Sequence, residues 1–141
     1  MPDTFTLKPY IYNLTICSKI ERDPQTGGWQ LWPLNHLAIH ALPTTLNLSL
    51  FVGVLGPAGT YQLKFRLFHT EDSVATPLFQ PVNLPVQANK NVEYIGQASI
   101  TLKVTGLYLV EAALNDYYLA YAPLRLSTVA AMDISTAQSQ A

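Results

Sequence analysis

The most informative stretch of the sequence is residues 105–126, TGLYLVEAALNDYYLAYAPLRL. It has the pattern of a tight β-hairpin, in which two apolar strands flank Asn115 and Asp116 as a two-residue turn. Such a loop pairs Leu114 with Tyr117, and this pair sets the register of the whole hairpin. Asn-Asp is a less favoured turn than Asn-Gly, and a loop of three or four residues would shift that register.

The predicted register gives the hairpin two faces. The core face holds Tyr108, Val110, Ala112, Leu114, Tyr117, Leu119 and Tyr121. The opposite face is nearly as apolar, whereas the outer side of a sandwich strand is normally polar. We therefore expect the second face to be covered too, by another segment of this chain or by a second copy. The predicted interface residues on it are Leu107, Leu109, Glu111, Ala113, Tyr118 and Ala120.

Two residues modify this simple hairpin. Glu111 interrupts an otherwise apolar strand, and we expect it on the outer face, paired with Lys64 or Arg66 of a neighbouring strand. A buried carboxylate with a raised pKa is the functional alternative for Glu111. A bulge at Pro123 would reverse the alternation beyond it and turn the following leucines inward.

Three further stretches alternate apolar and polar residues, at 46–55, 61–70 and 92–104. A period of two places one face of a strand on a core and the other in water. Ten prolines and seven glycines punctuate the chain. The pattern predicts an all-β protein, an antiparallel β-sandwich of about seven to nine strands. Its single domain is expected over residues 1–127, with 128–141 as a loosely ordered C-terminal tail.

The composition excludes several classes of protein. The net charge is −1 and the eight basic residues are scattered, which argues against nucleic-acid binding. A single cysteine excludes an intramolecular disulfide. With neither a signal-peptide pattern nor an apolar run long enough for a membrane span, the expected location is the cytoplasm. Only 12% of residues are charged, so the surface is either dressed in uncharged polar groups or partly covered by a partner.

Three motifs carry a family resemblance: ICSKIERDPQTGGWQLW (16–32), GPAGTYQLKFRLFHTED (56–72) and TGLYLVEAALNDYYLAYAPLRLS (105–127). Across residues 10–127 the chain resembles a widespread group of small uncharacterised bacterial proteins. The resemblance implies an immunoglobulin-like β-sandwich, and it brings no agreed activity, cofactor or catalytic residue. The chain departs from the usual opening of that group, since Ser18 stands after Cys17 where an acidic residue is frequent.

The candidate chemistry is sparse. His36 and His40 share a face on a strand or a helix, but two histidines without a third ligand make a weak metal site. His69, Glu71 and Asp72 fall in a predicted turn, where polar residues are normal for solvation and capping. We therefore predict no catalytic residue, no metal and no cofactor.

Cys17 is expected to be a small buried hydrophobe, because no partner base is evident for a nucleophile. Trp29 and Trp32 are candidates for a sugar-stacking platform, but their spacing of three puts them on opposite faces of a strand, so at least one is expected in the core.

The function predicted from the sequence is that of a non-enzymatic interaction or structural module. It would self-associate, or bind another protein, through an apolar sheet face or edge. Two alternatives stay open: a carbohydrate- or peptide-binding β-sandwich module, and a subunit of a larger filament or phage-type particle. An enzyme would need one of the histidines in a pocket beside a carboxylate.

Overall fold

The computed structural model describes residues 8–129 as ten strands in two packed sheets, so the predicted all-β, immunoglobulin-like sandwich is confirmed. The strands are β1 (Tyr10–Arg22), β2 (Trp29–Pro33), β3 (His36–Ile39), β4 (Thr44–Leu55), β5 (Gly59–His69), β6 (Val74–Pro77), β7 (Val82–Val86), β8 (Val92–Leu102), β9 (Gly106–Leu114) and β10 (Tyr117–Thr128). Residues 8–129 contain no helix, and therefore none that is long and apolar enough to span a membrane. The tail expected at 128–141 falls almost wholly outside the described residues.

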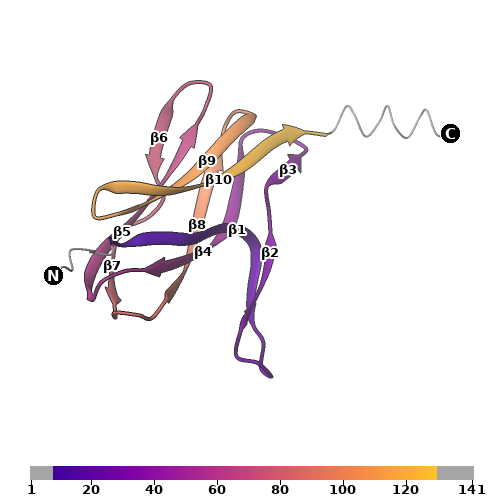
Figure 1. The fold of residues 1–141 in the computed structure, drawn as a ribbon. Coiled ribbons are helices and arrows are strands. Elements are labelled where there is room, and N and C mark those ends of the chain that lie inside the picture. The colour runs from indigo at the N-terminus through magenta and orange to yellow at the C-terminus, as the bar shows by residue number, and fades with distance from the viewer. Residues whose placement is uncertain (1–7, 130–141) are drawn as a thin grey trace.

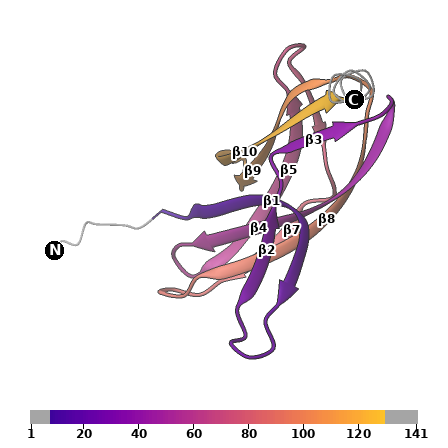
Figure 2. The ribbon, with the colours of Figure 1, turned by 90° about the vertical axis from the view of Figure 1, so that its right-hand side faces the viewer.

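Sheet A has the strand order β2-β1-β4-β8, and sheet B has the order β3-β10-β9-β5-β6. Strand β7 also pairs with β5, over the half of β5 that β6 leaves free. Every strand pairing within residues 8–129 is antiparallel except that of β3 with β10, which is parallel. Figures 1 and 2 show the two layers and, below them, the β1–β2 ribbon that projects beyond the sandwich. The ribbon projects because β1 pairs with β4 only up to Cys17.

The core lies between the sheets and is built from alternate residues of the long strands. In β5, Leu63, Phe65 and Leu67 are buried, and in β9, Val110 and Ala112 are fully buried. The residues between them therefore face away from the core, because successive side chains of a strand point to opposite sides. This alternation defines the outer face of sheet B, on which the candidate site lies.

The hairpin turn is as predicted, but the face assignment of its second strand is wrong. Leu114 pairs with Tyr117, and Asn115 and Asp116 both have positive φ, as turns of this length require. A bulge between Tyr118 and Ala120 then leaves Leu119 without a partner, so Ala120 lies opposite Ala112. One extra residue reverses the alternation for the rest of the strand.

The bulge moves residues between the two faces. Leu124 and Leu126 are buried, as expected of a reversed alternation, but the reversal starts at Leu119 and not at Pro123. Leu119 and Tyr121, which were expected in the core, are exposed instead, with Tyr121 at 58%. Tyr117, also expected in the core, is 73% exposed although it precedes the bulge and pairs with the buried Leu114.

Tyr108 holds the corner where β8 of sheet A passes into β9 of sheet B. Its hydroxyl donates to the carbonyl oxygen of Val104, four residues earlier, at 2.6 Å. The ring is buried in the core, and Gly106 turns the chain with a φ of 128° between the two residues. A tyrosine that bonds back across such a corner is a hallmark of immunoglobulin-like sandwiches.

Replacing Tyr108 with Phe removes only the hydroxyl of this corner. We expect Tyr108→Phe to lower the free energy of unfolding by about 1–3 kcal/mol, because the Val104 carbonyl loses its donor in a partly buried site. Urea unfolding followed by fluorescence measures the change. Tyr10→Phe, on an exposed side chain of β1, is the matched control and should leave stability unchanged within about 0.5 kcal/mol.

Candidate functional site

The outer face of sheet B is a continuous surface that runs over β10, β9 and β5. Residues paired across the strands lie side by side on it. The register gives three rows across the three strands: Tyr118–Ala113–Lys64, Tyr121–Glu111–Arg66 and Pro123–Leu109–Phe68. A further pair, Arg125–Leu107, follows at the far end of the hairpin. Most of these side chains are apolar or aromatic, which is unusual for the outside of a sandwich.

An ion pair lies at the centre of this face. The Nε of Arg66 donates to Oε1 of Glu111, as expected from the sequence. Glu111 is only 6% exposed, although it lies on the outer side of the sheet. The guanidinium carbon of Arg66 also lies 3.8 Å from the centre of the Tyr118 ring. The hydrogen bond with Glu111 raises the pKa of Arg66, so the guanidinium stays positively charged beside the carboxylate.

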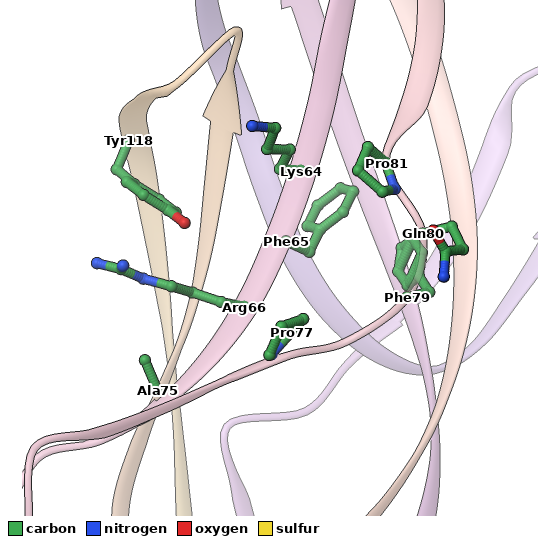
Figure 3. Close-up of a pocket in the computed structure, with 9 residues that line it drawn as sticks. All are labelled: Lys64, Phe65, Arg66, Ala75, Pro77, Phe79, Gln80, Pro81 and Tyr118. Carbon is green, nitrogen blue, oxygen red and sulfur yellow. The ribbon is translucent and has the colours of Figure 1, made fainter.

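A second ion pair lies at the hairpin tip, where Nζ of Lys64 meets Oδ1 of Asp116. Between these cations and the segment that follows β6 is a shallow pocket of about 830 Å³. Figure 3 shows Arg66 and Tyr118 reaching out side by side on one wall, with Pro77 and Phe79 on the other. The residues that line the pocket include no carboxylate and no imidazole.

The structure places five of the six predicted interface residues on this face. Leu107, Leu109 and Tyr118 are half-buried there, and Glu111 and Ala113 are buried between their neighbours. Ala120 lies on the inner side, because the bulge at Leu119 reverses the alternation.

Sequence reasoning missed three residues of the face: Phe68, Tyr121 and Pro123. Phe68 had a visible signal, since it alternates with the buried Leu67 and therefore points outward. The sequence gives no such signal for Tyr121 and Pro123, because the bulge determines which face of the sheet they lie on.

The three histidines do not come together. His36 is exposed, with Nε2 2.9 Å from Oγ of Ser127, and His40 is exposed as well. His69 is buried at the C-terminal end of β5, beside Asp72. Among residues 8–129, no three groups of histidine, cysteine or carboxylate type lie close enough to hold a metal ion.

Cys17 is fully buried, as expected, and burial raises the pKa of its thiol. The expectation that Trp29 or Trp32 lies in the core is wrong, since Trp29 is partly exposed and Trp32 is 41% exposed. Both stand on the projecting ribbon, which one layer cannot bury. Their rings lie against cations instead, Trp29 against Arg22 and Trp32 against Lys19.

No family model and no curated protein matches the chain. Similar solved structures include a β-glucosidase from Erythrobacter marinus, with a TM-score of 0.50 at 12% identity, over 85% of this chain and 15% of that one. An alkylpurine DNA glycosylase from Pseudomonas fluorescens, bound to DNA with an abasic site analogue, has a TM-score of 0.49 at 13% identity, over 85% and 30% of the two chains. A CARDB domain from Pyrococcus furiosus, in complex with di-metal ions, has a TM-score of 0.47 at 12% identity, over 89% and 98%. The chain thus spans less than a third of the two enzymes, and likeness at this identity is a likeness of fold alone.

Removing Arg66 tests the ion pair on this face. We expect Arg66→Ala to lower the free energy of unfolding by about 2–3 kcal/mol, because it strands the buried Glu111 carboxylate without a partner. The double variant Arg66→Met/Glu111→Leu should recover to within about 1 kcal/mol of the unmodified protein, because no buried charge is left. Urea unfolding measures both, and a double variant as unstable as Arg66→Ala would contradict this account.

Proposed function

We propose that this protein is a non-enzymatic interaction module that self-associates through the outer face of sheet B, in the cytoplasm of a bacterial cell. The observation that supports it is an apolar sheet face whose only central charges neutralise each other. Burying that face removes Leu109, Phe68 and Tyr121 from water and leaves no new unpaired ion. Its motifs support membership of the bacterial immunoglobulin-like group that they resemble.

The charges at the two ends of the face favour a second copy as the partner. Asp116 pairs with Lys64 at the hairpin tip but keeps its side chain 81% exposed, and Arg125 lies exposed at the other end of β10. A twofold axis across the strands would bring the Asp116 end of one copy to the Arg125 end of the other. A twofold interface uses one surface patch twice, so this single self-complementary face suffices to close a dimer.

An exposed and a half-buried position test this interface. We expect the unmodified protein to elute as a dimer at tens of micromolar in size-exclusion chromatography with light scattering. Tyr121→Lys should weaken the dimer at least tenfold, because Tyr121 is exposed in one copy and would be desolvated in two. Leu109→Glu should abolish the dimer by placing a second carboxylate beside Glu111 in the apolar centre.

Gln97→Lys is the matched control, because Gln97 is exposed on β8 of sheet A, away from the proposed interface. Circular dichroism checks that each variant folds. A monomer at tens of micromolar for the unmodified protein would refute the proposal. Filaments or ring particles in electron micrographs would replace the twofold dimer with a head-to-tail arrangement, open in a filament and closed in a ring.

A further inference from the structure

A buried histidine joins two connections at the far end of the sandwich. His69 is the last residue of β5 and is only 6% exposed. The turn from β5 to β6 follows it, closed by a hydrogen bond from the Ser73 amide to the His69 carbonyl at 2.9 Å. The β8–β9 corner lies on its other side, and the His69 and Tyr108 rings pack with centres 4.6 Å apart. This cluster is separate from the outer face of sheet B.

Both ring nitrogens of His69 face oxygen acceptors. Nε2 lies 3.1 Å from the carbonyl oxygen of Thr105, in the corner. Nδ1 lies 3.0 Å from Oδ1 of Asp72, in the turn. A carbonyl and an ionised carboxylate only accept, whereas a neutral imidazole carries one N–H and one lone pair. The neutral ring would therefore direct a lone pair at an oxygen inside a buried site. Only the imidazolium suits both neighbours.

The Asp72 contact acts through charge more than through direction. Although the atoms are close, Nδ1 has no hydrogen-bond partner of adequate alignment. The carboxylate is held in place by its own turn, since Oδ1 of Asp72 accepts from the amide of Val74 at 3.1 Å. A fixed anion beside a ring of low solvent exposure stabilises the protonated ring.

Gly106 makes the close approach of the two connections feasible. A Cβ at this position would stand 2.8 Å from Nε2 of His69 and 3.2 Å from Oε1 of Glu71. The φ of 128° at Gly106 also lies in a region that other residues rarely adopt. The glycine thus permits both the corner and the contact of His69 with it.

Burial and the other charged or polar groups around the ring also affect its pKa. Burial of the ring lowers its pKa, but the Thr105 carbonyl, Asp72 and Glu71 together outweigh it, so the pKa of His69 is raised. The amide of Val74, with a contribution from His69, lowers the pKa of Asp72. Burial and the nearby carboxylates raise the pKa of Tyr108, which therefore stays neutral. Lys103 lines the solvent side of the same cluster.

We propose that His69 is a pH-sensitive clamp, which in its protonated form ties the β5–β6 turn to the β8–β9 corner and on deprotonation releases the turn. A histidine with a raised folded-state pKa contributes stability fully below its unfolded pKa of about 6.5. That contribution is lost as the pH rises through the folded pKa. Because the pKa of Asp72 is lowered, its contribution is present above about 3.8 and is lost as the pH falls through the folded value.

Release of the turn would act on the neighbouring groove. A groove of about 310 Å³ separates β6 from the edge of β8, and it is lined at one end by His69 and Asp72 and along its length by Val74, Thr76 and Ser99. Within residues 8–129, β4 is the one strand that pairs with β8. Loosening the clamp would leave β6 held by its pairing with β5, beside an unpaired strand edge of β8, the kind of edge that accepts an added strand.

Nuclear magnetic resonance of the full chain tests the clamp directly. The ¹⁵N shifts of the His69 ring should show both nitrogens protonated at pH 6.5, with a midpoint above that measured for the exposed His40 in the same titration. Asp72→Asn should lower the midpoint of His69 by at least half a pH unit. Because the side chain of Asp72 is 52% exposed, this variant is expected to fold. Glu93→Gln, on an exposed residue of β8, is the control and should leave it unchanged.

Hydrogen exchange tests the release. After correction for the intrinsic pH dependence of exchange, protection of residues 70–77 should fall at least tenfold between pH 6 and pH 9, while protection of β9 and β10 stays constant. In His69→Gln, whose side chain does not titrate, the corrected protection should be independent of pH. A His69 midpoint at or below that of His40, a midpoint unmoved in Asp72→Asn, or pH-independent protection in the unmodified protein would each overturn the clamp.

Discussion

Strand β9 lies between β5 and β10 and carries buried residues on both faces, including a carboxylate, and the neighbouring strands provide for this. Its inner residues make the centre of the core, and its outer residues Glu111 and Ala113 are buried as well. A carboxylate in that position costs several kcal/mol unless it is paired. Arg66 meets the requirement from the neighbouring strand, and the Tyr118 ring lies against the Arg66 guanidinium. The central charges of the outer face of sheet B are therefore paired with each other, and the side chains around them are mostly apolar or aromatic.

The bulge at Leu119 sets what this face presents. Without it, Tyr121 would point into the core, and Ala122 and Leu124 would point outward. With it, small and branched side chains fill the interior and the tyrosine stands on the outside. A bulge also twists its strand and interrupts its free edge, which discourages uncontrolled pairing with other chains. The same residue thus places Tyr121 and Pro123 on the outer face of sheet B.

The β8–β9 corner shows a different kind of dependence. Gly106 and Tyr108 are close in the sequence, and the Gly-x-Tyr pattern is visible there. His69, however, lies 36 residues before Thr105, the corner residue whose carbonyl oxygen its ring contacts. The spacing of His69, Glu71 and Asp72 was that of an ordinary polar turn, and only the packing of one sheet against the other buries the ring and gives its nitrogens their two oxygen neighbours. The fold thus buries His69, which the sequence placed in an ordinary turn, while His36 and His40 stay at the surface.

The sequence by itself determined the class of fold, most strand positions, the two-residue hairpin turn and the pairing of Glu111 with a basic residue on the adjoining strand. These follow from local alternation, turn chemistry and the cost of a lone carboxylate among apolar residues, all of which act within a few residues or between neighbours in a ladder. Only the tertiary structure decided the side taken by Ala120 and Tyr121, the exposure of both tryptophans and the environment of His69. The position of the bulge depends on how side chains fill the core. The exposure of the tryptophans depends on the length by which the β1–β2 ribbon extends beyond the sandwich. The environment of His69 depends on two connections that meet across the sandwich. Each of these is a long-range packing outcome, which the local pattern of residues does not encode.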